Sequence, residues 1–185
     1  MTLPELRIGH ATDAEARTGC TVLVGPFRAA GHVCGHATGS REMDVLSLLH
    51  LVPRIDALVL TGGSAFGLAA ADGVVAWLEE RGIGFDVGVA HVPIVPAAVI
   101  FDLANGRADR RPDAAMGRAA CEAAVTGPPE TGAVGAGTGA TSGKLRGRDR
   151  VLPGGFGYAA GTSGAHAIVA VVVVNPLGYV IDEDG

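Results

Sequence analysis

Two polar side chains stand out because the residues around them are small or apolar. Lys144 lies in the segment TGAVGAGTGATSGKLRG, where most neighbours are Gly, Ala, Ser or Thr, and Asn175 ends the apolar run VAVVVVN. A lysine held beside a nucleophile can lower that group's pKa or stabilise developing negative charge. An asparagine amide can serve as an oxyanion donor. Structural roles stay open for both, since most lysines are solvated and Asn175 with Pro176 fits a turn.

The glycine-rich segment before Lys144 fails the tests for a phosphate-binding loop. A Walker loop requires Gly, four residues and then Gly-Lys-Ser/Thr, but its two end positions hold Thr138 and Leu145. The GxGxxA spacing that begins at Gly135 fits a dinucleotide loop, yet no strand leads into it and no helix of useful length follows it. We therefore predict that the protein uses no cofactor.

A second candidate lies in TGGSAFG, where a predicted strand meets a predicted helix. The nucleophile elbow of lipases, GxSxG, requires glycine two residues after the serine, and after Ser64 that position is Phe66. We therefore predict that Ser64 caps the helix that follows. Free backbone N–H groups at that helix start could hold an anion or a carbonyl oxygen.

Composition limits the class of protein and of partner. The chain has 185 residues, of which 48% are hydrophobic, and this favours one domain with one sizeable core. A formal net charge of −5 gives no overall basic character for binding nucleic acid. The N-terminus MTLPELRIGH lacks the features of a signal peptide, and no run of about 18 uncharged apolar residues could span a membrane. We expect a cytoplasmic protein with no nucleic-acid or membrane partner.

Cysteines and histidines predict no metal site. The three cysteines form no CxxC pair, so we interpret them as reduced thiols. His32 and His36 have the i,i+4 spacing of helical metal ligands. Glycines interleave them, however, and make a helix unfavourable there.

The remaining pattern predicts strands and helices without the regular βα alternation of a Rossmann sheet. Apolar residues recur every four positions from Phe66 to Leu78, and Gly82 provides a stop, which indicates the strongest helix, at 66–82. Two more helices are predicted at 40–50, capped by Ser40, and at 113–125. Strands are predicted at 20–24, 31–39, 55–60, 98–103, 158–160 and 167–174.

Five stretches taken together resemble one family. They are, in chain order, GSREMD, LTGGSAFGLAAADGVVAWLEERGIGF, VPIVPAAVIFDL, GAVGAGTGATSGKLRG and VVVVNPLGYVID. They are similar to the N-terminal part of the P1-family peptidases, the DmpA-type L-aminopeptidase/D-esterases. That family includes the β-peptidyl aminopeptidases and the nylon-oligomer hydrolases. The resemblance runs in order through nearly all 185 residues.

This resemblance implies a fold and a mode of catalysis. The fold would be an α/β, four-layer α/β/β/α sandwich of the DmpA and ornithine acetyltransferase type, completed by a second chain. Residues 1–185 would form a single domain fragment, the N-terminal (α) part of a precursor that cleaves itself. The nucleophile would be a Ser or Thr exposed at the N-terminus of the β chain, with its own α-amino group as base. The αβ units would assemble into a homo-oligomer.

Site residues carry over by motif. The resemblance implies that Asn175 is the oxyanion-hole asparagine and that Lys144 matches a lysine found near the nucleophile in some members. It also implies substrate contacts from the helix start after TGG and from the amides of the glycine loop. The residues expected to contact substrate are Gly63, Ser64, Phe66, Gly137 and Thr138.

The chain departs from the family pattern at two points. Phe66 falls where the resemblance places a Tyr whose hydroxyl helps to hold the oxyanion, and loss of one such donor costs about 100- to 1000-fold in rate in other enzymes. The sequence also holds neither the cleavage loop nor the nucleophile. Thr138, Thr141 and Ser142 carry hydroxyls, but none of them is at a chain start.

The expected function is a self-processing N-terminal-nucleophile amide or ester hydrolase of aminopeptidase type, acting on short peptides, amino-acid amides or esters. An acetyltransferase of the ornithine acetyltransferase type stays open, as does a non-catalytic relative that binds a metabolite. Because half of a sandwich exposes an apolar sheet face, we expect that this chain is not soluble alone. Gly185 is expected to mark the passage from an ordered segment to the loop that leads to the cleavage site.

Overall fold

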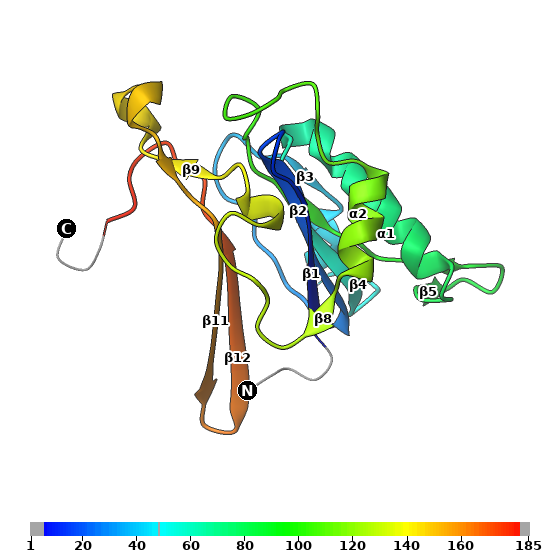
Figure 1. Cartoon of the computed structure of the whole chain (residues 1–185). Helices are drawn as coiled ribbons and strands as arrows, with labels where there is room; N and C mark the ends of the chain where they lie inside the picture. The colour runs from blue at the N-terminus through cyan, green and yellow to red at the C-terminus, as the bar shows by residue number, and fades with distance from the viewer. Residues whose placement is uncertain (1–5, 48, 182–185) are drawn as a thin grey trace.

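The computed structural model of the chain describes residues 6–47 and 49–181 (Figure 1). The expected transition at Gly185 lies outside the described residues. At the centre is a six-stranded mixed sheet, in which β4 and β7 run parallel and all other neighbours run antiparallel. Its strands, in spatial order, are β3 (Ser40–Arg41), β7 (Ala97–Val99), β4 (Ile55–Thr61), β2 (Thr18–Phe27), β1 (Arg7–Asp13) and β8 (Val125–Thr126).

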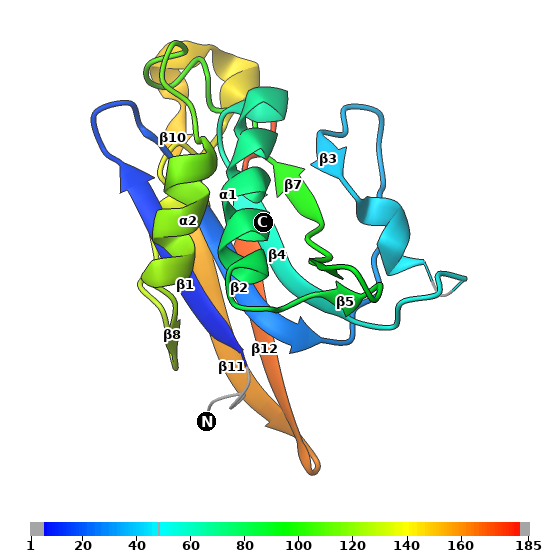
Figure 2. The same cartoon turned by 90° about the vertical axis from the view of Figure 1, so that its right-hand side faces the viewer.

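Two helices, α1 (Ala70–Glu79) and α2 (Ala114–Glu122), cover one face of this sheet (Figure 2). Alternate residues of β2, namely Cys20, Val22 and Val24, are fully buried in the core cluster that the helices share with the sheet. Side chains on a strand alternate between faces, so the residues between them serve the opposite face. No helix within residues 6–47 and 49–181 is both long and apolar enough to cross a membrane.

The two helices touch through backbone rather than side chains. A Cβ placed on Gly73 of α1 would lie 1.8 Å from the Ala114 carbonyl oxygen, and one on Gly117 of α2 would lie 1.9 Å from the Ala70 carbonyl oxygen. Both distances are far below van der Waals contact. Only glycine fits at these two positions, which explains part of the high glycine content of the chain.

The strongest predicted helix exists, but it has two parts. A 3-10 helix, η2 (Ser64–Ala69), leads directly into α1, and Gly82 follows the helix end with φ of 66°. Ser64 does not cap it, because the capping position is Gly63 and no side chain supplies a cap hydrogen bond there. At α2, by contrast, the Asp113 carboxylate accepts from the Met116 N–H at 3.0 Å, as an N-cap should.

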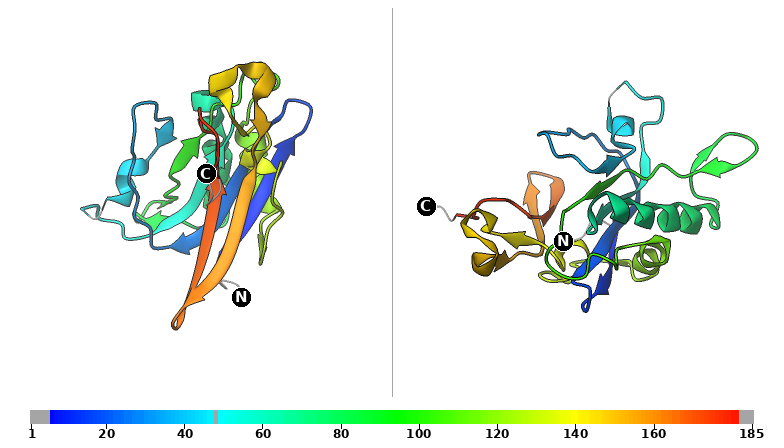
Figure 3. Two further views of the ribbon diagram at one scale, coloured as in Figure 1. Left: turned by 90° about the vertical axis from the view of Figure 1, so that its left-hand side faces the viewer. Right: turned by 90° about the horizontal axis from the view of Figure 1, so that it is seen from above.

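A long hairpin lies across the other face of the sheet (Figure 3, left). It consists of β11 (Phe156–Ser163) and β12 (His166–Val173), which pair with each other over eight residues and form a separate two-stranded sheet. Val171 and Val173 pack against a second cluster formed by Ile8, Leu23 and Phe156. The residues between them point away, and Ile168 and Val172 are about half exposed (53% and 47%). The apolar run seen in the sequence is therefore a strand with one covered side.

Shorter elements complete the fold. They are η1 (Met43–Leu46), β5 (Phe85–Asp86), β6 (His91–Val92), η3 (Gly135–Gly137), β9 (Thr141–Ser142), η4 (Lys144–Arg146), η5 (Arg148–Arg150) and β10 (Leu152–Pro153).

Two predicted elements were wrong, and one strand longer than three residues was missed. Residues 31–39 form no strand, and all of them but Gly39 are exposed, so the segment buries too little surface to be held against the sheet. The predicted helix at 40–50 contains only the single turn η1, and Ser40 belongs to β3 instead of capping it. The strand predicted at 98–103 is confirmed only as the short β7. The missed strand is β1, whose RIGHATD lacks apolar alternation.

Candidate active site

Lys144 projects from η4 toward the chain segment that follows β12. Two backbone bonds tie these segments together: the Gly143 N–H donates to the Gly178 carbonyl at 2.6 Å, and the Leu145 N–H donates to the Leu177 carbonyl at 3.1 Å. Gly143, with φ of 80°, leaves no room for a side chain, because a Cβ there would lie 2.6 Å from the Tyr179 ring. The two motifs predicted to carry chemistry are therefore neighbours in space.

Every hydrogen of the Lys144 ammonium has a protein acceptor. Nζ donates to the Thr141 carbonyl at 2.6 Å, to Asn175 Oδ1 at 2.9 Å and to the Pro176 carbonyl at 2.9 Å. A lysine carries three donors, and here all three are used. Partial burial lowers the pKa of Lys144 from its ordinary value, because burial disfavours the charged form. Lys144 is thus a fixed internal cation and not a solvated surface charge.

These contacts also fix the orientation of the Asn175 side chain. Its Oδ1 receives the Lys144 ammonium and the Thr141 N–H at 3.0 Å, and only an oxygen can accept from both. Its Nδ2 donates one hydrogen to the Phe101 carbonyl at 2.8 Å. An amide nitrogen carries two hydrogens, and within the described residues the second has no acceptor. The arrangement presents one polarised N–H for a further oxygen.

A cavity of about 290 Å³ opens beside Lys144. Its walls come from the segment after β7, from β9 and from the two 3-10 turns that follow. The lining residues are Phe101, Asp102, Ala104, Asn105, Thr141, Lys144, Arg148 and Val151. This volume is at the lower end of the range for small-ligand pockets, which suits a short substrate.

Asp102 forms the buried end of this cavity, with only 4% of its surface exposed. Its carboxylate accepts from the Thr18 hydroxyl and from the Gly63 N–H, each at 2.7 Å. Gly62 passes so close that a Cβ there would lie 2.1 Å from Asp102 Oδ2. Asp102 therefore locks the TGG turn to the cavity wall, and both of its oxygens have partners.

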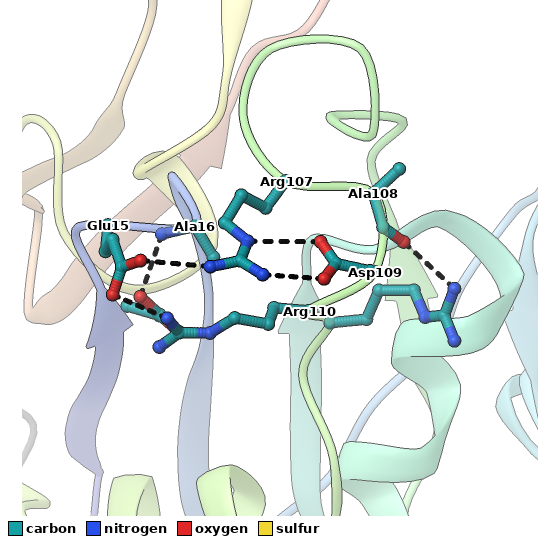
Figure 4. Close-up of polar contacts among 8 residues, drawn as sticks. Glu15, Ala16, Arg107, Ala108, Asp109 and Arg110 are labelled. Atoms are coloured by element: carbon teal, nitrogen blue, oxygen red, sulfur yellow. Dashed lines mark hydrogen bonds and ion pairs between the residues drawn. The ribbon is translucent and has the colours of Figure 1, made fainter.

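The loop after Asp102 is held by an ionic network on the surface (Figure 4). Arg107 bonds Asp109 at 2.7 Å and Glu15 at 3.1 Å, while Arg110 bonds Glu15 at 2.6 Å and also pairs with Asp13. Exposed pairs are individually weak, but several that share partners can hold a loop. The network fastens the cavity wall to the turn between β1 and β2.

Gly63, Ser64 and Phe66 are not among the residues that line this cavity. The Gly63 N–H is used by Asp102, and the Ser64 N–H donates to the Ile100 carbonyl at 3.0 Å. Phe66 is 60% exposed, and the Arg111 guanidinium lies 4.3 Å from its ring centroid. Two of the donors at this helix start, the Gly63 and Ser64 N–H groups, thus have internal acceptors.

Gly137 and Thr138 lie in and after η3, on the sheet face that the hairpin covers. The Gly137 N–H donates to the Val134 carbonyl at 2.9 Å, and the Thr138 hydroxyl donates to the Gly135 carbonyl at 2.6 Å. A Cβ on Gly137 would lie 2.1 Å from the Phe156 nitrogen. The glycine run therefore allows close packing, and its substrate role stays a prediction.

The two buried cysteines are unsuited to act as nucleophiles, and the described part of the chain shows no metal site. Burial raises the pKa of the Cys20 and Cys121 thiols to about 12, so neither ionises near neutral pH. No group of three or more His, Cys, Asp or Glu suited to hold a metal occurs within residues 6–47 and 49–181.

Comparison with known proteins identifies the family. The family model for Peptidase family S58 matches residues 2–180. The chain belongs to peptidase family S58. It is 45% identical over 190 residues to an uncharacterised aminopeptidase of Mycobacterium bovis, covering 96% of this chain and 52% of that protein. It is 36% identical over 182 residues to the 6-aminohexanoate-oligomer endohydrolase of Kocuria, covering 98% and 49%. The resemblance inferred from the motifs is confirmed.

The S58 chain also matches a solved structure in fold. The L-aminopeptidase D-Ala-esterase/amidase of Ochrobactrum anthropi, described as a variant among the Ntn hydrolase fold, superposes with a TM-score of 0.73 at 18% identity. The match covers 94% of this chain and 52% of that one. The chain thus spans about half the length of the relatives it matches.

Two functional features were missed at the level of sequence. Asp102 looks like an ordinary acid after a strand, and its burial depends on Thr18 and Gly63, which are distant in sequence. Arg148 lines the cavity within KLRGRDR, where four of seven residues are basic, a cluster that the net charge of −5 hides. Counting charge in short windows would have found the second feature.

Proposed function

We propose that this S58 chain is the α part of a self-processed N-terminal-nucleophile hydrolase of aminopeptidase type. Its substrates are short peptides, amino-acid amides or esters. The nucleophile is a Ser or Thr at the start of a β chain from the same precursor. The observation that carries the proposal is the Asn175 amide, whose oxygen is held by Lys144 and Thr141 while one Nδ2 hydrogen stays available.

The proposed reaction assigns each group one role. The nucleophile's hydroxyl oxygen attacks the substrate carbonyl, and its own α-amino group takes the hydroxyl proton. The carbonyl oxygen becomes an oxyanion and accepts the free Asn175 N–H. The C–N or C–O bond then breaks, the leaving group takes the proton from the α-amino group, and water hydrolyses the resulting ester. The products are the free acid and an amine or alcohol, and the enzyme is restored.

Lys144 acts in this proposal through Asn175 and not on the substrate. All three of its hydrogens are used by the protein, so it has none to donate to an oxyanion. Its charge polarises the Asn175 amide and makes the Nδ2 hydrogen a stronger donor. Phe66 supplies no hydroxyl, so this N–H carries more of the oxyanion stabilisation than it would beside a tyrosine.

The second chain would complete the proposed four-layer α/β/β/α sandwich. The described residues supply a helix layer, a sheet layer and part of a second β layer. Exposed apolar residues on β12 support a partner there, because large apolar patches mark interaction sites. Family S58 membership favours hydrolysis over acetyl transfer. We further propose that the αβ units assemble into homo-oligomers, which ultracentrifugation of the processed protein would test.

The test uses the full-length precursor. On a denaturing gel it should separate into two chains, and Edman sequencing should find Ser or Thr at the start of the second. The processed protein should release p-nitroaniline from aminoacyl p-nitroanilides. A single uncut chain without activity on these substrates would overturn the proposal. Acetylation of the β chain by N-acetylornithine would instead support an acetyltransferase.

A further inference from the structure

A cation with no partner faces the cavity beside the proposed reaction centre. Arg148 lines the cavity together with Lys144, and it forms no ion pair within the described residues. Arg107, Arg110 and Arg118 contrast with it, since each of them has a carboxylate partner. Arg148 is thus an exposed guanidinium on a cavity wall with its donors unused.

Two cations and one acid line the cavity. Its one acid is Asp102, whose two oxygens already accept from Thr18 and Gly63 at the buried end. Its other charged residue, Lys144, is a cation. Four basic residues and one acid lie between positions 144 and 150, in a chain of net charge −5. The electrostatic potential at the opening of the cavity is therefore positive, although the chain as a whole carries a net negative charge. A positive potential favours anionic ligands.

Arg148 is placed by its turn to act on a ligand. Gly147, with φ of 97°, redirects the chain between η4 and η5, so that Arg148 opens η5 as Lys144 opens η4. A guanidinium presents paired N–H donors that match a carboxylate's two oxygens. The neighbouring cation Arg146 stacks instead near the Tyr179 ring, 5.3 Å from its centroid.

We propose that Arg148 binds a carboxylate of the substrate, so that the enzyme prefers short peptides bearing a free acid over their uncharged amides. This inference rests on the proposed function and narrows its substrate class. The carboxylate has two possible sources, the peptide C-terminus and an acidic side chain. The binding acts on ground state and transition state alike, so its effect falls on KM more than on kcat.

The experiment compares three substrates on the processed full-length enzyme. They are alanyl-alanine, its C-terminal amide, and alanyl-aspartyl amide, which carries the acid only on its side chain. The Arg148→Gln variant should reduce the preference for acid over amide, measured as a ratio of KM values, by about tenfold, as expected for a lost charged hydrogen bond. The acidic substrate whose KM preference over the amide falls in Arg148→Gln identifies the source of the bound carboxylate.

Arg150→Gln provides the matched control, because it removes the same charge from the same short helix without touching the cavity lining. An equal drop in both variants would mean general charge attraction and would overturn a role for Arg148. An unchanged ratio in Arg148→Gln would overturn it too.

A separate binding measurement distinguishes failure of this inference from failure of the proposed function. If none of the three peptides is hydrolysed, the hydrolase proposal fails, and calorimetric binding of alanyl-alanine and its amide then tests Arg148 alone. Tighter binding of the acid that disappears in Arg148→Gln would support the inference. Equal affinities for acid and amide would overturn it.

Discussion

The two faces of the six-stranded sheet differ in how completely they are covered. On one face, α1 and α2 close over alternate residues of β2 and β4, and the helices meet at Gly73 and Gly117 with no space left for a side chain. On the other face, the hairpin β11–β12 covers part of the sheet and turns half-exposed valine and isoleucine outward. The helix-covered face is closed within the chain, whereas the hairpin-covered face leaves apolar side chains exposed.

The candidate site lies at the end of the hairpin-covered face. Asn175 follows β12 directly, and Lys144 reaches it from the segment after β9. We propose that the helix side contributes stability, whereas the hairpin side contributes to assembly and chemistry. Substitutions on the helix-covered face should therefore lower stability, whereas substitutions on the hairpin-covered face should impair assembly or activity.

The largest effect is expected at Asn175. Asn175→Asp keeps the size of the side chain but replaces the N–H donor by an acceptor, so kcat should fall about 100- to 1000-fold, as for loss of an oxyanion donor. Asn175→Ala should give a similar loss. Steady-state kinetics with an aminoacyl p-nitroanilide checks both, with thermal unfolding to confirm that the variants fold.

Asn105→Ala is the matched control for this site. Asn105 lines the cavity beside Lys144, and its Nδ2 likewise donates one hydrogen bond, to the Gly139 carbonyl at 2.9 Å, but within the described residues no cation donates to its Oδ1. Its loss should cost about tenfold in kcat at most, the value of one neutral hydrogen bond. Equal losses at positions 105 and 175 would remove the special role of Asn175.

The next effect concerns the open side of the hairpin. Val172→Lys should weaken assembly of the two-chain enzyme by about 3 kcal/mol, because the partner would have to bury an unpaired charge. Size-exclusion chromatography of the processed precursor, with its yield of assembled enzyme, measures this. Val125→Lys, on the edge strand β8 where Val125 is also exposed, should leave assembly intact. Normal assembly of Val172→Lys would show that no partner covers the face.

Substitutions on the closed, helix-covered face should change only the stability of the protein. Gly117→Ala inserts a methyl group against the Ala70 carbonyl and should cost about 2 kcal/mol of unfolding free energy, despite the better helix propensity of alanine. Gly161→Ala, in β11 with open space around it, is the control and should change stability by less than about 0.5 kcal/mol. Urea denaturation compares the two. A larger loss at Gly161 would reverse the assignment of closed and open faces.

The smallest effect is expected from pH, through His10 of β1, whose side chain lies next to Gly135 of η3. Burial lowers the pKa of His10 below 6.5, a shift that the backbone and carboxylate of Glu130 oppose. The unfolded chain therefore takes up a proton at higher pH than the folded chain. Stability should be complete above pH 6.5 and fall as pH drops below it. Urea midpoints at about pH 8 and about pH 5 measure the loss, and His10→Gln should reduce it. An unchanged difference between the two urea midpoints in His10→Gln would exclude His10 as the source of the loss.

The sequence predicted the regular core better than the irregular site. Both helices follow from hydrophobic periodicity, and strands β2, β4 and β12 follow from short apolar runs rich in β-branched residues. Lys144 and Asn175 were identified, but their mutual contact was not, since it depends on a turn at Gly143 and on bonds to Gly178. The strand predicted at 31–39 failed because glycine spacing was interpreted as close packing there. Such packing exists at Gly73 and Gly117 instead.

Lys144 is the only lysine in the sequence, and its ammonium is enclosed by three oxygens. In the native fold this amine should react slowly with acylating reagents, since they require a free lone pair and an open approach. Loss of the contact to Asn175 would open the approach to this amine, which reacts once it has lost its proton. The chain therefore contains its own chemical reporter, and mass spectrometry of a single labelled side chain could follow the integrity of the site independently of turnover.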